Sequence, residues 1–448
     1  MAKRWTDDEL RHAFDELPMP TQPILNYRPG TTSSISHLHS ARPSRWYLPA
    51  AAVLAIGMIG LPAWIHRTQA VGKPTITTKS RRESTLLPWR PLGLAGFDMV
   101  TPTDGWGFAM EGTNVYRTAS GANRWVQVGR LKPTPGGQVT DDALNSQQAI
   151  VVNDYMQHHK AYVRVASTQD GGRLWAYHKV DVPGINLMSG TVFAGSMSSA
   201  WANMRDGSFL ISSAPRTAKD PLPPGKLYVT RDGGTTWSSV SLPRPLRKTF
   251  GQLTMSTSNR LWVTTRRELF RYSLSHHTWT PVSFGSAMVM GPPKFWNGGQ
   301  DGAVLTKGAV GLSVRTTKDG GTRWSKGVTI PGIFHGKLFV ANGRDWWVWS
   351  VSEDPSVHTS GRLLATNDAG RVWTPLGVPK GLPINLIFSG AQFLGSQFGV
   401  LDSTVSASNP LPVYYVTHDG GRDWSQLKPE ARLSEKQMVT TNGVSLGN

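Results

Sequence analysis

The chain contains no cysteine, and its carboxylates and histidines are the candidates for catalysis and metal binding. Thiolate nucleophiles, cysteine-based zinc sites and disulfides are therefore excluded. The histidines include two adjacent pairs, His158-His159 and His276-His277. Neighbours in a strand point to opposite faces, so neither pair makes a metal site by itself. No Gly-rich phosphate loop or nucleophile elbow follows a suitable strand. The sequence thus predicts no cofactor and no metal ion.

Carboxylates are the remaining candidates, since a glycosidase needs two of them on either side of the scissile bond. After residue 90 the chain has five glutamates: Glu111, Glu268, Glu353, Glu430 and Glu435. Apart from five aspartates in a repeated motif, the aspartates there are Asp98, Asp104, Asp141, Asp142, Asp154, Asp181, Asp206, Asp220, Asp301, Asp345, Asp354, Asp402 and Asp423. Several precede glycine, as in Asp104-Gly105 and Asp206-Gly207, where a role in the turn is favoured over catalysis.

The repeated motif is an octapeptide, Thr-x-Asp-x-Gly-x-x-Trp, which occurs five times in one register. Its third, fifth and eighth positions are Asp170, Gly172, Trp175; Asp232, Gly234, Trp237; Asp319, Gly321, Trp324; Asp368, Gly370, Trp373; and Asp419, Gly421, Trp424. The Thr ends an apolar strand, where β-branching suits the pleat. The Asp can accept hydrogen bonds from the following backbone N–H groups. The Gly permits a backbone angle that a Cβ resists, and the Trp covers the turn.

Two weaker copies extend the repeat to seven units: Thr118…Ser120…Ala122…Trp125, and the stretch Leu269–Trp279. The seven tryptophans are separated by 50, 62, 42, 45, 49 and 51 residues. This spacing is typical of a four-stranded propeller blade. We expect an all-β, seven-bladed β-propeller over residues 91–448, with three strands before each motif and one after it. Either residues 86–96 or residues 425–448 could supply the strand that closes the ring.

These motifs resemble the Asp box of the Asp-box (BNR) propellers, which include sialidases, sortilin-type receptors, two-domain xyloglucanases and proteins like the photosystem II assembly factor. The resemblance covers roughly residues 91–430. It implies that the motif lies in a peripheral turn of each blade, so that the five box aspartates are structural and not catalytic. The early Arg-Ile-Pro signature of sialidases is missing, since Arg90-Pro91-Leu92 stands there instead. The resemblance is specific for the fold and says little about activity.

The N-terminal 90 residues read differently. We expect residues 1–45 to form a polar tail with an amphipathic helix at 7–17, where Leu10, Ala13, Phe14 and Leu17 would share one face. Nineteen uncharged residues run from Tyr47 to Ile65, which predicts a transmembrane helix at 46–65. Residues 66–90 are expected to form a basic stalk. The alternative to the anchor is a signal peptide cleaved after Ala70.

The formal charge of +18, from 47 Lys+Arg against 29 Asp+Glu, favours anionic partners. We expect a membrane-anchored, non-enzymatic binding or scaffold propeller, held at the cell membrane by a single span, with the propeller outside the cytoplasm. Its partner would be a protein or an anionic envelope polymer. Nucleic acid is disfavoured, because an exported domain rarely meets it. A sialidase-like glycan hydrolase or lyase is the alternative function.

Overall fold

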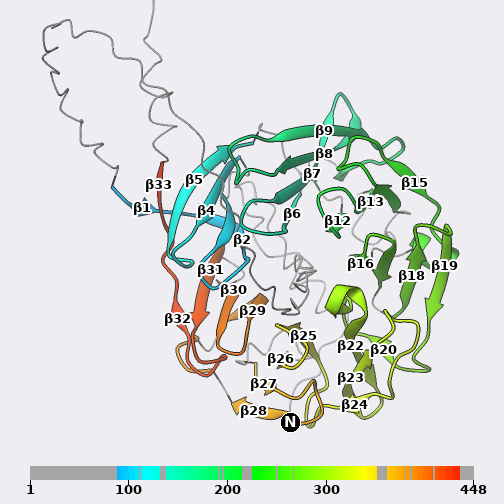
Figure 1. Ribbon diagram of the computed structural model, residues 1–448, viewed down its shortest axis with the longest axis vertical. Helices are drawn as coiled ribbons and strands as arrows, with labels where there is room; N and C mark the ends of the chain where they lie inside the picture. The colour runs from blue at the N-terminus through cyan, green and yellow to red at the C-terminus, as the bar shows by residue number, and fades with distance from the viewer. Residues whose placement is uncertain are drawn as a thin grey trace, which may run out of the picture.

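The computed structural model describes residues 88–433, apart from residues 110–112, 132–137, 190–191, 194–195, 214–224, 249–250, 266, 351–360, 378, 384–385 and 407–408. The described chain forms seven sheets of four or more strands, almost entirely antiparallel, arranged as blades around an axis (Figure 1). The expected all-β, seven-bladed propeller is confirmed. In each blade the first strand lies toward the axis and the last lies at the rim (Figure 1).

The first four blades, numbered I to IV in chain order, each follow a simple meander. Blade I contains β2 (Leu94–Met99), β3 (Gly105–Ala109), β4 (Asn114–Thr118) and β5 (Arg124–Arg130); blade II contains β6 (Val139–Ala143), β7 (Ala149–Gln157), β8 (Lys160–Thr168) and β9 (Ala176–Asp181). Blade III contains β12 (Ser196–Trp201), β13 (Gly207–Ser212), β14 (Lys226–Thr230) and β15 (Ser238–Val240); blade IV contains β16 (Gln252–Thr257), β17 (Arg260–Thr264), β18 (Leu269–Ser273) and β19 (Thr278–Val282).

The last three blades repeat the pattern with one variation. Blade V contains β20 (Met288–Val289), β21 (Lys294–Trp296), β22 (Asp301–Gly308), β23 (Gly311–Thr317) and β24 (Val328–Thr329), and both β20 and β21 pair with β22. Blade VI contains β25 (Gly336–Val340), β26 (Trp346–Ser350), β27 (Leu363–Thr366) and β28 (Thr374–Gly377); blade VII contains β29 (Ile387–Leu394), β30 (Phe398–Ser406), β31 (Asn409–Thr417) and β32 (Ser425–Gln426). A hairpin of β10 (Met188–Ser189) and β11 (Val192–Phe193) and two 3₁₀ turns, η1 (Arg244–Lys248) and η2 (Asn297–Gly299), lie between blades or strands.

The hydrophobic core is divided into clusters that each lie between two neighbouring blades. Alternating side chains of each strand face the blade on either side, so every blade contributes to two clusters. The cluster between blades IV and V is the smallest, with Trp262, Leu269, Val289, Phe295 and Val304 as its buried members. Burial of apolar side chains between blades thus stabilises the ring at each junction.

The ring is closed by the C-terminal segment. Strand β33 (Glu430–Leu433) joins blade I as a parallel neighbour of β5, and β1 (Arg90–Pro91) pairs with β33. Both candidate segments therefore take part in closure, at the outer edge of blade I. Blades VII and I are also joined directly, because the Gln392 amide accepts from the backbone N–H of Met99 at 2.9 Å and donates to its carbonyl at 2.6 Å.

The expected helix at 7–17, the transmembrane helix at 46–65 and the stalk at 66–90 lie outside the described residues, apart from residues 88–90 of the stalk. Within the described residues, no helix has the length and apolar character needed to cross a membrane.

Candidate functional site

The five predicted boxes all connect the last two strands of a blade, at the rim. In blade II, the Thr168 hydroxyl donates to Asp170 Oδ1 at 2.9 Å and accepts from the backbone N–H of Gly172 at 3.0 Å. The same Asp170 oxygen accepts from the N–H groups of Arg173 and Leu174, both at 3.0 Å. The turn is thus held by its own side chains, as expected for the carboxylate. The sequence reasoning missed the hydroxyl, which is the centre of the network.

The network repeats in the other boxes. The corresponding Thr hydroxyls of blades III, V, VI and VII donate to Asp232, Asp319, Asp368 and Asp419 over 2.7–2.9 Å. Side-chain and backbone donors of Thr236 lower the pKa of Asp232 to about 2. The pKa values of Asp170, Asp319, Asp368 and Asp419 are also lowered, mainly by hydrogen bonds from backbone N–H groups. These carboxylates are ionised and occupied with their own turns.

The box glycines allow close packing between blades. Gly172 has a φ of +87° and Gly321 a φ of +77°. A Cβ at Gly321 would lie 2.3 Å from the ring of Trp262 in blade IV. The indoles of Trp175, Trp237 and Trp424 each donate to the carbonyl of their box glycine, at 3.2, 2.9 and 3.0 Å. Trp324 and Trp373 lack such an acceptor among the described residues.

The two weak copies differ from each other. In blade I the Trp125 indole donates to the Ala122 carbonyl at 2.6 Å, so the box frame is kept. In blade IV the box is replaced by a short turn that contains His276 and His277, and Trp279 lies within β19, opposite Tyr272. His158 and His159 also form a turn, between β7 and β8, with φ values of 48° and 60°. Neither histidine pair lies in a strand, which corrects the assumption made from the sequence.

Carboxyl groups nearer the axis have the opposite electrostatics. Asp98 of β2 hydrogen-bonds Asp141 of β6, and burial raises the pKa of Asp98 well above its usual value. Burial also raises the pKa of Asp141 to about 6, and that of the neighbouring Asp142. Asp98 and Asp142 are 2% and 8% exposed. Burial thus disfavours the charged form of each of these three carboxyls.

A fourth inner carboxyl lies between blades VI and VII. Burial raises the pKa of Asp402 of β30 to about 7, although the charge of Lys337 of β25 opposes this shift. The ammonium of Lys337 also lies over the Phe388 ring, 5.2 Å from its centroid. In blade V, burial lowers the pKa of Lys294 to about 8. We call Asp98, Asp141, Asp142 and Asp402 the inner carboxyls. None of the described residues form a cluster suited to a metal ion.

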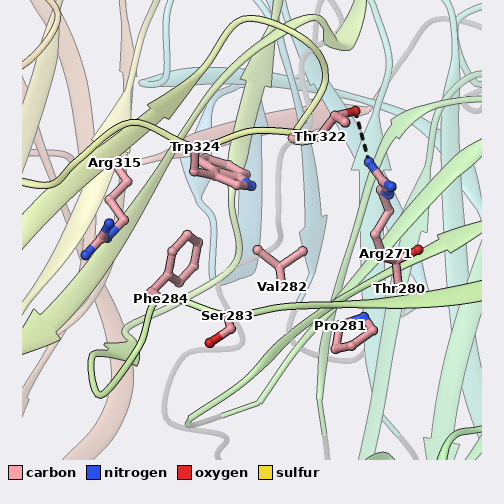
Figure 2. Close-up of a pocket in the computed structure, with 10 residues that line it drawn as sticks. Arg271, Thr280, Pro281, Val282, Ser283, Phe284, Arg315, Thr322 and Trp324 are labelled. Carbon is pink, nitrogen blue, oxygen red and sulfur yellow. Dashed lines mark hydrogen bonds between the residues drawn. The ribbon is translucent and has the colours of Figure 1, made fainter.

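An open groove of about 260 Å³ lies at the rim between blades IV and V. We call it the IV–V groove; its principal lining residues are Arg271, Val282, Phe284, Arg315, Thr322 and Trp324. Figure 2 shows the two arginines on either side of the aromatic and aliphatic side chains. The rings of Phe284 and Trp324 meet edge to face, with centroids 5.9 Å apart. The groove therefore has a cation at each end and half-buried aromatic and aliphatic side chains between them.

Both guanidinium groups are held in place by neutral oxygens. Arg271 donates to the Thr322 hydroxyl at 3.1 Å (Figure 2). Arg315 donates to the Ser325 carbonyl at 3.3 Å and lies over the Phe284 ring, 5.1 Å from its centroid. Among the residues that the structure describes, neither arginine has a carboxylate partner. The groove thus has two positive charges that the fold leaves unbalanced.

Of the residues singled out in the sequence, the groove contains Gly321 and Trp324, and Arg271 lies within the weak copy Leu269–Trp279. Neither Arg271 nor Arg315 was predicted as a functional residue, although each is a charged residue inside the next-to-last strand of its blade, β18 or β23. A cation in such a strand is a signal that could have been followed. Arg271 and Arg315 lie on one groove because blades IV and V are in contact, and no local sequence pattern encodes this contact.

No protein-family profile matches the sequence, and no curated protein matches it. Solved structures do resemble the fold. YCF48 bound to a D1 peptide aligns at 12% identity and a TM-score of 0.48, over 74% of this chain and 97% of that chain. YCF48 from Cyanidioschyzon merolae aligns at 14% identity and a TM-score of 0.45, over 74% and 97%. An ulvan lyase of polysaccharide lyase family PL25 aligns at 12% identity and a TM-score of 0.43, over 78% and 96%. Such similarities concern the fold alone.

Proposed function

We propose that this protein is a non-enzymatic binding propeller that holds a protein or an anionic envelope polymer at the cell membrane. The observation that carries the proposal is the IV–V groove, where Arg271 and Arg315 flank aromatic and aliphatic side chains and, among the described residues, have no carboxylate partner. Two cations on one groove favour a ligand with negative groups. The formal charge of +18 favours the approach of the same class of partner.

The arrangement of the described carboxyl groups favours a binding function over glycoside hydrolysis. A glycosidase keeps its two carboxyls about 5–9.5 Å apart, so that the substrate or a water fits between them. Asp98 and Asp141 instead hydrogen-bond each other directly, and Asp98 is 2% exposed. The box aspartates are occupied by their own turns. Neither set is arranged as an accessible acid and base.

The anchor belongs to the proposal on sequence grounds. The uncharged run from Tyr47 to Ile65 is long enough for one span. We propose that it holds the propeller outside the cytoplasm, where envelope polymers and membrane-protein loops are available as partners. Expression with a reporter fused to the C-terminus, combined with protease protection of intact cells, tests this location. A reporter that is active only in the cytoplasm would contradict it.

The function itself is tested with the full-length protein. Immobilised protein should retain material from an envelope extract, and should release no product from a panel of neutral and acidic glycans. If glycan turnover is seen and is abolished in Asp141→Asn, the hydrolase or lyase alternative replaces the binding function. If nothing is retained and nothing is cleaved, the proposal is wrong. If the immobilised protein retains DNA as well as it retains envelope material, and if this retention falls steeply with salt concentration, the partner would be nucleic acid instead.

A further inference from the structure

The IV–V groove lies beside the short outer strand of blade V. Strand β24 pairs with Ser313 and Val314 of β23. Ser325, which precedes β24, extends this contact, because its N–H donates to the Thr316 carbonyl at 2.8 Å and its hydroxyl accepts from the Thr316 N–H at 2.9 Å. Arg315 is half-buried and lines the groove. The smallest of the interblade clusters lies at the same junction.

The two arginines present different surfaces to a ligand. Arg315 donates from Nε and Nη1 to protein oxygens and stacks on Phe284. Arg271 uses only Nη1, for the Thr322 hydroxyl, so among the described residues its Nε and Nη2 have no acceptor. Two such adjacent N–H groups match the two oxygens of a carboxylate.

The remaining lining is hydroxylated. Thr280 and Ser283 line the groove and are exposed. The Thr322 hydroxyl donates to the Asp319 carbonyl at 3.1 Å and therefore has only acceptor capacity left for a ligand. A volume of about 260 Å³ lies just below the range of pockets for drug-sized ligands, so the groove suits roughly one ring.

We propose that the IV–V groove binds a carboxylated sugar unit of an anionic polysaccharide. The C–H face of the ring packs on Trp324, the carboxylate pairs with Arg271, and ring hydroxyls meet Thr280 and Ser283. The neighbouring unit of the polymer places its negative charge toward Arg315. This inference rests on the proposed binding function and names the class of polymer.

An acidic peptide has the same charge, but it carries backbone amides that need acceptors and donors in register, as an open strand edge provides. At the groove the backbone N–H and carbonyl of Thr316 are already bonded to Ser325. The groove instead offers the isolated hydroxyls of Thr280 and Ser283 beside Trp324, which fit a polyhydroxylated ring better. We therefore commit to the sugar and treat the peptide as an outcome of the experiment.

The experiment is calorimetric titration of the full-length protein with trigalacturonic acid. Its methyl ester, triglutamate and inorganic phosphate serve as comparison ligands. Arg271→Gln removes the guanidinium, and Arg271→Lys keeps the charge but not the planar fork. Arg371→Gln is the matched control. Arg371 is an exposed arginine in the box of blade VI, so this substitution removes the same charge at a distant position. Thermal unfolding shows whether each variant is folded.

We expect trigalacturonic acid to bind, and Arg271→Gln to weaken it by about ten-fold or more. Arg271→Lys should weaken it by at least about three-fold, while Arg371→Gln leaves it unchanged. Equal weakening by Arg271→Gln and Arg371→Gln, or equal binding of the methyl ester, would overturn the site. Triglutamate binding as tightly would indicate an acidic peptide, and phosphate binding as tightly would indicate a simple anion site. If trigalacturonic acid does not bind but envelope material is still retained, this inference fails and the binding function stands.

Discussion

Aspartates at the rim of this propeller and aspartates near its axis have the same side chain, but they differ in hydrogen bonding, in burial and in the direction of their pKa shift. The box carboxylates, such as Asp419, accept hydrogen bonds from their own turn, and this lowers their pKa. The inner carboxyls, such as Asp402, lie among packed strands, and burial raises their pKa. The difference shows that the local donors around a carboxylate, and its access to water, decide its charge. A rim aspartate stabilises its turn as an anion, whereas burial shifts an inner aspartate toward its protonated form.

The largest effect should come from the hydroxyl at the centre of a rim network. Thr417 is buried, and its hydroxyl donates to Asp419 at 2.8 Å and accepts from the N–H of Gly421 at 2.9 Å. Thr417→Val should lower the free energy of unfolding by about 2–3 kcal/mol, because it leaves a buried N–H without an acceptor. Urea denaturation followed by tryptophan fluorescence measures the loss. Thr374→Val, at an exposed position of β28, should change little, and equal stability of both variants would contradict the role of the hydroxyl.

An intermediate effect should appear as a pH dependence of the inner carboxyls. The pKa of Asp402 is about 7 in the fold, against an ordinary value of 3.8. The folded state keeps this proton after the unfolded chain has lost it, so Asp402 makes stability fall as the pH rises between those two values. Asp402→Asn should flatten this fall by about 1–2 kcal/mol in total, allowing for partial exposure of the carboxyl.

The matched variant for that experiment is Asp419→Asn at the rim. The lowered pKa of Asp419 means that its contribution is present above its ordinary value and is lost as the pH falls below it. Unfolding free energies at several pH values from about 4.5 to about 7.5 should therefore give a constant difference between wild type and Asp419→Asn. Parallel curves for wild type and Asp402→Asn would show that the inner carboxyl is ionised in the fold after all.

The smallest effect should come from one box that departs from the repeat. Ala369 has a φ of 63°, where the boxes of blades II, III, V and VII have a glycine with positive φ. Ala369→Gly should raise the free energy of unfolding by about 0.5–1 kcal/mol, since it relieves a left-handed non-glycine residue. Gly420→Ala is the reverse change in blade VII, where a Cβ would lie 2.6 Å from the Ser396 carbonyl oxygen. Thermal unfolding should move in opposite directions for the two, and a shared direction would contradict this explanation.

The sequence by itself determined the features that are encoded within one blade. The period of the tryptophans fixed the seven blades, and the pattern Thr-x-Asp-x-Gly-x-x-Trp fixed the turn between the last two strands of a blade. Both follow from strand pairing and hydrogen bonds between residues close in the chain. The histidine turns escaped this reasoning, because nothing in His158-His159 distinguishes a tight turn from a strand.

Only the tertiary structure decided which residues meet between blades. Three features join residues that are distant in sequence. They are the closure by β33, the contact of Asp98 with Asp141, and the positions of Arg271 and Arg315 on one groove. Each depends on how neighbouring sheets pack, and the repeat leaves that packing free to vary from junction to junction. The local pattern specified the blades, and the packing of unlike blades produced the sites.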